Sequence, residues 1–161
     1  MVMNEDYQLA YLIDHPHFLA DVVKLNVESF RQFYPNTTEA AVTEKFKAHL
    51  NRNALPICFI LIKNQKLIAT TCLRKFDFPK TNTPTYWSEG TIVHPEYRNQ
   101  GIATLLLQKV MQEAKKIYDG YWFGYTAILE KLLTRLGWET LEEMDYNGVP
   151  GVVMRIDVRA I

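Results

Sequence analysis

The loop of residues 98–101 joins a β-prone stretch, residues 86–93, to a segment with helical spacing that begins at Gly101. The first amides of a helix have no partner within the helix, and the helix dipole makes their surroundings positive. Gly101 lets the backbone approach a ligand closely, and Arg98 adds a fixed positive charge. A strand, a glycine loop and a helix N-terminus in this order predict a binding site for a diphosphate group.

This loop does not match the two most familiar phosphate-binding motifs. The Gly-Lys-Ser/Thr of the P-loop is missing, and so is the third glycine of the dinucleotide-binding fingerprint. An ordinary strand-turn-helix with one glycine is therefore the alternative interpretation of the loop.

The wider pattern around the loop is more specific. It resembles the acetyl-CoA-binding motif of the GNAT superfamily of N-acetyltransferases, and it reads Val93-x-Pro95-x-x-Arg98-x-x-Gly101-Ile102-Ala103. The resemblance implies that amides of the loop and of the first helical turn hold the CoA pyrophosphate, and that the end of the strand pairs with the pantetheine arm. The cofactor-binding residues that it implies are Ile92, Val93, Arg98, Asn99, Gln100, Gly101, Ile102, Ala103 and Thr104.

Two looser matches flank this motif. Residues 132–138, with Leu136-Gly137-Trp138 at their end, resemble the family's C-terminal Phe-Tyr-x-x-Leu-Gly-Phe box. The string Trp87-x-Glu89-x-x-x-Val93 resembles relatives that acetylate protein N-termini. The chain departs from the family at Leu133, which stands where the usual tyrosine acts as general acid and cannot donate a proton.

The reaction implied by the resemblance is direct attack of an amine on the acetyl thioester in a ternary complex. An alkylamine has a pKa of about 10.4 and must first lose a proton. Glu89 is the expected proton acceptor, because its position matches the glutamate that some relatives use; a surface glutamate is the alternative. Tyr125 is the expected substitute for the missing acid, directly or through water, with core packing as its alternative.

The acceptor is expected between the first two helices, the loop of residues 77–84 and the final hairpin. Phe30, Tyr34 and Trp87 are the predicted acceptor-binding residues, with simple packing as the alternative. A small-molecule amine and a peptide N-terminus both remain open as acceptors, because variable loops build such pockets. No third ligand stands at workable spacing from His15 and His17, so no metal site is expected.

The predicted elements form a single domain over residues 1–161, with a mixed α/β (α+β) sheet flanked by helices. Their order, β-α-α-β-β-β-α-β-α-β-β, is also that of the GNAT fold. The predicted strands are residues 7–13, 57–63, 67–76, 86–93, 121–125, 138–144 and 152–158, and the predicted helices are residues 17–33, 38–50, 101–118 and 127–136.

Composition limits the partners. The chain has 161 residues, with 18 basic and 18 acidic side chains and no basic run, so neither a nucleic acid nor an anionic membrane is an expected partner. No apolar stretch is long enough to span a bilayer, and the N-terminus does not resemble a signal peptide. Cys58 and Cys72 read as buried free thiols, which indicates a reducing compartment, the cytoplasm.

The sequence therefore predicts a cytoplasmic N-acetyltransferase that uses acetyl-CoA as its donor. A non-catalytic acyl-CoA-binding or regulatory module is the main alternative, favoured by Leu133 and opposed by Glu89. A nucleotide-binding protein is a third interpretation. Members of the superfamily are often dimers, so a homodimer and a monomer both remain open.

Overall fold

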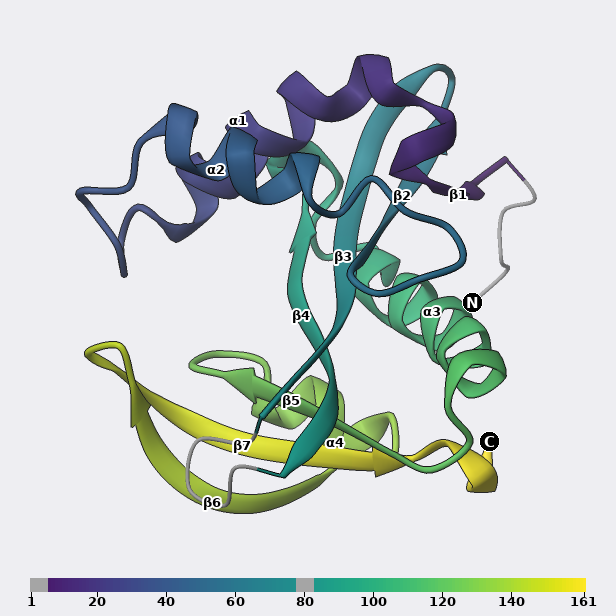
Figure 1. Ribbon diagram of the computed structural model, residues 1–161, viewed down its shortest axis with the longest axis vertical. Coiled ribbons are helices and arrows are strands. Elements are labelled where there is room, and N and C mark those ends of the chain that lie inside the picture. The colour runs from purple at the N-terminus through teal and green to yellow at the C-terminus, as the bar shows by residue number, and fades with distance from the viewer. Residues whose placement is uncertain (1–5, 78–82) are drawn as a thin grey trace.

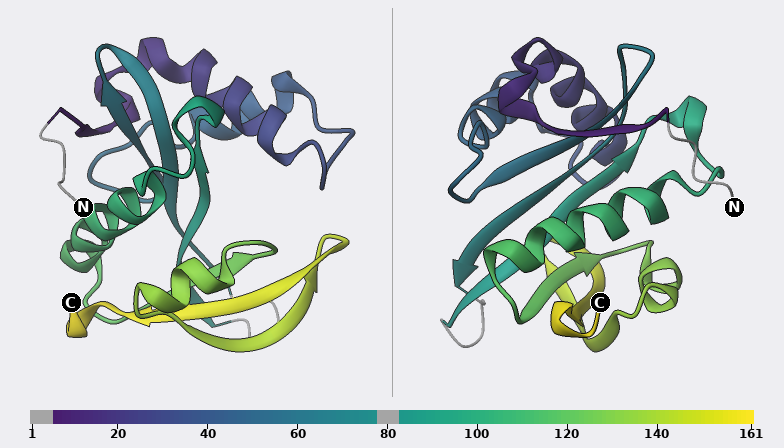
Figure 2. Two further views of the ribbon diagram at one scale, coloured as in Figure 1. Left: turned by 180° about the vertical axis from the view of Figure 1, so that it is seen from behind. Right: turned by 90° about the vertical axis from the view of Figure 1, so that its right-hand side faces the viewer.

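The computed structural model describes residues 6–77 and 83–161, which form one seven-stranded sheet between two layers of helices (Figures 1 and 2). The strand order is β1-β2-β3-β4-β5-β7-β6, and all neighbours are antiparallel except β4 and β5. The strands are β1 (Gln8–Tyr11), β2 (Ile57–Lys63), β3 (Lys66–Asp77), β4 (Pro84–Val93), β5 (Tyr121–Thr126), β6 (Glu139–Tyr146) and β7 (Val149–Asp157). The helices are α1 (Leu19–Phe30), α2 (Glu39–Lys47), α3 (Ile102–Ile117) and α4 (Glu130–Arg135). The predicted fold class and element order are confirmed.

Several predicted boundaries were wrong by two or three residues: the first strand ends at Tyr11, the first helix is Leu19–Phe30, and the second helix ends at Lys47. Two further differences have identifiable reasons. The last helix was expected from Ala127 but begins at Glu130, because the Thr126 hydroxyl accepts the amides of Ile128 and Leu129 in a turn before the helix. The last strand was expected from Val152 but begins at Val149. Asn147 and Gly148 both have positive φ and close a two-residue hairpin turn, so the strands extend further towards it.

Apolar side chains form a core on each face of the sheet. On one face, Val22 of α1 and Phe46 of α2 pack over Ile60 of β2. On the other face, Leu106 of α3 packs with Trp122 of β5. The strand β2 is buried almost throughout because it carries core residues on both faces, which explains its unbroken apolar sequence.

A β-bulge in β4 sets the direction of the side chains that follow it. Cys72 of β3 lies opposite Glu89, but Thr70 lies opposite Ile92, so β4 holds one extra residue between these pairs. Gly90 has φ +67°, a left-handed conformation that favours glycine. Glu89 and Ile92 are three positions apart, yet both face the layer of α1 and α2 because of this bulge.

The sheet is splayed between its two parallel strands. The ladder of β4 and β5 contains two residue pairs, Tyr86 with Trp122 and Trp87 with Phe123. Beyond them β4 continues with β3, and β5 continues with β7. Figure 1 shows β4 rising from the lower strands towards α1 and α2, away from β5. One edge of β4 from Ser88 onwards therefore has no neighbouring strand among the described residues.

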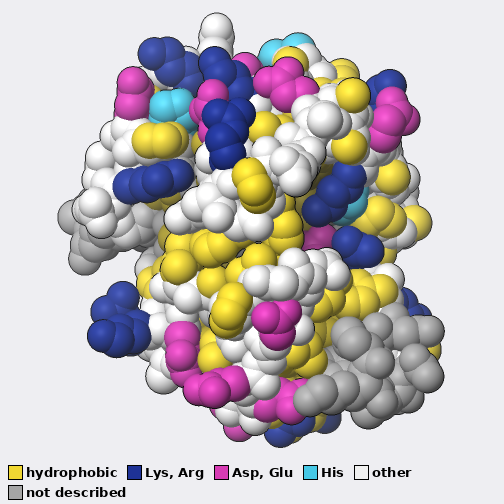
Figure 3. Space-filling model, turned by 90° about the vertical axis from the view of Figure 1, so that its left-hand side faces the viewer, with side chains coloured by type: hydrophobic (Ala, Val, Ile, Leu, Met, Phe, Trp, Pro, Cys, Tyr) yellow, Lys and Arg dark blue, Asp and Glu magenta, His cyan; other side chains and the backbone are white. Residues whose placement is uncertain are grey.

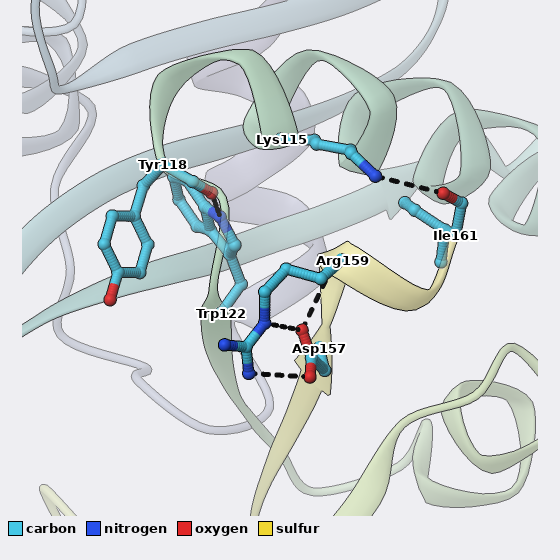
Figure 4. Close-up of polar contacts among 6 residues, drawn as sticks. All are labelled: Lys115, Tyr118, Trp122, Asp157, Arg159 and Ile161. Carbon is cyan, nitrogen blue, oxygen red and sulfur yellow. Dashed lines mark hydrogen bonds and ion pairs between the residues drawn. The ribbon is translucent and has the colours of Figure 1, made fainter.

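Polar contacts fasten the C-terminal end of the chain to α3 (Figure 4). The Lys115 ammonium donates to the Ile161 carbonyl at 3.2 Å, and Arg159 donates three hydrogen bonds to the Asp157 carboxylate, one from its amide and two from its guanidinium. The Trp122 indole donates to the Tyr118 carbonyl at 3.0 Å, just after α3 ends. These contacts fix β5 and β7 at the end where the sheet is still continuous.

No helix within residues 6–77 and 83–161 is long and apolar enough to cross a membrane.

Candidate functional site

The loop between β4 and α3 leaves main-chain amides exposed at the start of the helix. Asn99 and Gly101 both have positive φ, and α3 begins at Ile102 without a side-chain cap. The first helical hydrogen bond runs from the Leu105 amide to the Gly101 carbonyl at 3.1 Å, so the preceding amides lie outside the helix's own hydrogen bonds. The Arg98 Nε donates to the Val93 carbonyl at 2.9 Å and fixes the guanidinium at the base of the loop. This geometry suits an anionic group.

A cavity of about 670 Å³, here called the loop cavity, opens beside these amides. Every predicted cofactor-binding residue lines it except Gln100, whose side chain is exposed and donates to the Glu96 carbonyl. Arg135 of α4 also lines it and adds a second cation that the sequence did not suggest. Its position directly before the Leu136-Gly137-Trp138 box was the available signal. These residues of the cavity wall are Ile92, Val93, Arg98, Asn99, Gly101, Ile102, Ala103, Thr104 and Arg135.

A second cavity of about 140 Å³, the junction cavity, occupies the splay between β4 and β5. Residues 88–91 line it from β4, and residues 124–126 line it from β5. A Cβ on Gly124 would lie 3.2 Å from the Trp138 ring, so glycine keeps this space open. Leu133 lies in the wall with only 6% of its surface exposed, so the position of the family's usual acid presents hydrocarbon to this cavity.

A third cavity of about 430 Å³, the aromatic cavity, lies between α1, α2 and the β6–β7 hairpin. Phe30, Tyr34 and Trp87 all line it. The Trp87 ring stacks on Phe76 with centroids 4.7 Å apart, and its indole donates to the Thr85 hydroxyl at 2.7 Å. Part of the loop expected to close this cavity, residues 78–82, lies outside the described residues.

The three cavities are contiguous. The junction and aromatic cavities share five lining residues, which are Phe30, Tyr34, Glu89, Gly90 and Tyr125. The loop and junction cavities also share a wall, formed by Phe30, Phe33, Thr91, Ile128 and Leu129. A ligand anchored at the helix N-terminus could therefore extend along the free edge of β4 and meet a second ligand beside Glu89 and Gly90.

Two cations hold the Glu89 carboxylate. Its Oε1 lies 3.0 Å from the Arg74 Nη1 and 3.7 Å from the Lys45 Nζ, and 28% of the side chain is exposed. The carboxylate therefore lies between two positive charges, which fix its orientation beside the junction and aromatic cavities. Neither cation was expected from the sequence. Both come from elements, β3 and α2, that approach Glu89 only in the folded chain.

The Tyr125 hydroxyl is held by the backbone of the final hairpin. It donates to the Met144 carbonyl at 2.9 Å and also contacts the Val149 carbonyl. Partial burial raises the pKa of Tyr125 above its ordinary value. Both features favour a structural role for this phenol over the predicted role of proton donor.

His49 lies buried beside the cluster of Lys45, Arg74 and Glu89. Its Nδ1 lies 2.8 Å from the Lys45 carbonyl, and its buried Nε2 has no hydrogen-bond partner among the described residues. Burial lowers the pKa of His49 below its ordinary value of 6.5, and the nearby Lys45 and Arg74 charges act in the same direction. His49 is therefore a neutral, buried side chain that packs at the end of α2. Within residues 6–77 and 83–161, no group of three His, Cys, Asp or Glu side chains could hold a metal ion.

Comparisons with known proteins show the family and the fold of this chain. The family model described as the acetyltransferase (GNAT) family matches residues 19–128. An acyl-CoA N-acyltransferase from Pseudomonas aeruginosa is 17% identical, with TM-score 0.69 and coverage of 94% of this chain and 98% of the other. A GNAT acetyltransferase from Staphylococcus aureus Mu50 is 13% identical, with TM-score 0.69 and coverage of 94% and 99%. An aminoglycoside 6'-N-acetyltransferase complexed with coenzyme A is 12% identical, with TM-score 0.73 and coverage of 94% and 97%. No match was found among curated protein sequences.

Proposed function

The chain belongs to the acetyltransferase (GNAT) family, and we propose that it moves the acetyl group of acetyl-CoA directly to a primary amine of a small molecule. The protein is accordingly an N-acetyltransferase. One observation carries the proposal: Glu89 and Gly90 line both the junction cavity and the aromatic cavity. They mark a place where a donor in the splay and an acceptor on the aromatic wall would touch.

The loop cavity fits the donor. The amides at the start of α3 that lie outside the helix's own hydrogen bonds, together with Arg98 and Arg135, supply positive potential for a pyrophosphate. The free edge of β4 offers main-chain groups to the amide-bearing pantetheine arm. Gly101 and Ala103 keep side chains short where the backbone would meet the phosphates.

The proposed reaction needs one proton acceptor. An ammonium acceptor loses a proton to Glu89, directly or through water, and its nitrogen then forms a bond to the thioester carbon. A main-chain amide on the free edge of β4 donates to the oxyanion that develops. The C–S bond breaks and the nitrogen loses its second proton. The CoA thiolate takes up one of the two protons, and Glu89 passes the other to solvent, so the sum is an amide, the free CoA thiol and one proton.

The leaving group needs little help. A thiol has a pKa of about 8.5, so the CoA thiolate leaves far more readily than an amide nitrogen would. Leu133 cannot donate a proton, and the Tyr125 hydroxyl is engaged with backbone carbonyls. The proposed mechanism therefore runs without a dedicated general acid.

The two cysteines support the predicted cytoplasmic location. Cys58 and Cys72 lie directly opposite each other on β2 and β3, and both are buried free thiols. The hydrogen bond with Cys58 and burial raise the pKa of the Cys72 thiol, which keeps it protonated. A facing pair of thiols in this state suits a reducing compartment.

The test of the function is the variant Glu89→Gln. With acetyl-CoA and a panel of amines, we expect kcat to fall by about 10² to 10⁴, the usual contribution of general base catalysis, while acetyl-CoA still raises the Tm. Glu44→Gln is the matched control, because Glu44 is an exposed residue of α2 paired with Lys47. An unchanged kcat would dismiss Glu89 as the proton acceptor. Donor binding without transfer to any amine would contradict the proposed transfer reaction.

A further inference from the structure

The charges that line the aromatic cavity do not balance. Among its described lining residues, three side chains are charged, and they are Lys45 of α2, Arg74 of β3 and Glu89 of β4. Both cations contact the same oxygen of Glu89. One carboxylate neutralises one of the two positive charges, so the cavity carries a net charge of about +1 beside the proposed site of transfer.

Arg74 has hydrogen-bond donors to spare. Its guanidinium lies over the Phe76 ring, 4.8 Å from the centroid, and a single Nη1 contact joins it to Glu89. Its other N–H groups find no acceptor among the described residues. The Lys45 ammonium is 3.7 Å from Glu89, which is beyond hydrogen-bond distance, so its donors are equally available.

A buried amide faces the same cavity from α1. Asn26 lies on the apolar side of the helix, next to Val27, with only 8% of its surface exposed. It lines the aromatic cavity, and its side chain has no hydrogen-bond partner among the described residues. Its amide nitrogen and oxygen are not among the fully buried polar atoms without a partner, so a ligand or water can reach them from the cavity. Asn26 therefore offers the cavity an accessible hydrogen-bond donor and acceptor.

The rest of the wall is apolar. Phe30, Tyr34, Phe76, Trp87 and Tyr146 supply most of its aromatic surface. Figure 3 shows a hydrophobic band across this face of the molecule, with basic side chains along one of its borders. The volume of about 430 Å³ suits a small molecule.

A polycationic acceptor fits this cavity poorly, because the described lining offers it no carboxylate other than Glu89. Asp145, at the end of β6, does not line the cavity, and its carboxylate accepts the Gly148 amide at 2.9 Å.

We propose that the acceptor is an amino-acid-like molecule, with a primary amine, a carboxylate or related oxyanion, and an apolar side chain. The amine lies at Glu89 and Gly90, the oxyanion lies on Arg74, Lys45 and Asn26, and the apolar part lies on the aromatic wall. This inference rests on the proposed function and specifies its substrate class. Arg74 then has two roles, because it orients Glu89 and binds the acceptor.

The experiment compares acceptors that differ in one group. Acetyl transfer is measured with L-phenylalanine, with phenethylamine, which lacks the carboxylate, with the phosphonate analogue of phenylalanine, and with spermidine. We expect kcat/KM to be at least about tenfold higher for phenylalanine than for phenethylamine, as for the loss of a charge-assisted contact. The phosphonate arm shows which oxyanion the site prefers.

Variants then show which residues cause the preference for phenylalanine over phenethylamine. In Arg74→Gln and Lys45→Gln, the ratio of the two kcat/KM values should fall towards one, because the ratio cancels any effect on Glu89 that both acceptors share. The matched controls are Lys75→Gln and Lys47→Gln, whose exposed side chains lie on β3 and α2 but do not line the cavity. Both controls should keep the wild-type ratio.

Product binding gives a readout that does not depend on turnover. N-acetylphenylalanine should raise the Tm of the wild type and do so less in Arg74→Gln. Equal or better transfer to phenethylamine or spermidine would overturn the inference while leaving acetyl transfer intact. Stabilisation by N-acetylphenylalanine without transfer to any acceptor would support the anion site and contradict the proposed function.

Discussion

Glu89 on β4 and Tyr125 on β5 line the same two cavities from neighbouring strands whose mutual ladder has already ended, at Trp87 and Phe123. The two side chains are held in different ways. Arg74 and Lys45 hold the carboxylate, whereas backbone carbonyls of the final hairpin hold the phenol. The splay thus brings together the Glu89 carboxylate, which is the proposed proton acceptor, and the Tyr125 phenol, whose hydroxyl already contacts backbone carbonyls.

The variant Tyr125→Phe tests this difference. Removing the hydroxyl takes one hydrogen-bond donor away from the Met144 and Val149 carbonyls, so the free energy of unfolding should fall by about 1 kcal/mol. We expect kcat to change less than about threefold, because general acid catalysis would contribute about 10² or more. Urea unfolding and steady-state kinetics measure the two effects. If turnover instead fell by about a hundredfold or more, Tyr125 would be restored as the proton donor.

The bulge at Gly90 can be tested with a matched pair of glycines. Gly90 and Gly137 both have positive φ, and a Cβ on either would have no heavy atom within 4 Å. Alanine should therefore cost about 1 to 2 kcal/mol of stability at each position, through backbone strain alone. Gly90→Ala should also lower kcat/KM, because its methyl group would enter the junction between the two cavities, while Gly137→Ala should keep it. Equal activity in the two variants would remove Gly90 from the site.

Arg98 should contribute to donor affinity. In Arg98→Gln, we expect the Kd for acetyl-CoA to rise about tenfold, the loss of one charge-assisted interaction with a phosphate. Isothermal titration measures the change directly, and the Tm rise at a fixed acetyl-CoA concentration should shrink in parallel. Arg52→Gln serves as the control, because Arg52 pairs with Asp14 and does not line the loop cavity. An unchanged Kd would show that main-chain amides hold the pyrophosphate without this side chain.

His49 should make stability depend on pH. Because burial lowers its folded-state pKa, the unfolded chain binds more protons than the folded chain once the pH falls below about 6.5. The contribution of the neutral histidine to stability is complete above that pH and is lost as the pH falls through the lowered pKa. Urea unfolding between pH 7.5 and 5.5 should show this decline, and His49→Gln should flatten it. The exposed His17, changed to Gln, is the control and should keep the wild-type slope.

The loop proposed to bind the donor could be located from the sequence because its residues are close together in the chain. Val93, Pro95, Arg98 and Gly101 lie within nine residues of each other, and local rules for strand ends, glycine and helix N-termini apply to them directly. The loop geometry and the element order follow from such local patterns. This explains why the family resemblance and the fold class could be recognised from one chain.

The acceptor side depends on contacts that local patterns do not contain. Lys45, Arg74 and Glu89 are far apart in sequence, and they meet only because α2 crosses the face of β3 and β4. Asn26 carried a readable signal, a polar residue at the helical spacing of buried Val22 and Val23. Arg74 carried none, because Lys75 follows it and Asp77 ends the same strand. The signal at Asn26 marks a polar residue on a core-facing position, but it does not reveal which residues share a cavity with it.

The short ladder of two residue pairs between β4 and β5 lies between the proposed donor loop and the proposed acceptor wall. The amides proposed to hold the donor come from the segment between β4 and α3, whereas the aromatic wall draws on α1, α2, β3 and the β6–β7 hairpin. Besides the two ladder pairs, a hydrogen bond from the Thr140 hydroxyl of β6 to the Glu130 carboxylate of α4 links that hairpin to the loop side. Substitutions in the hairpin can therefore change which acceptor the chain binds during evolution, while the residues of the proposed donor loop stay the same.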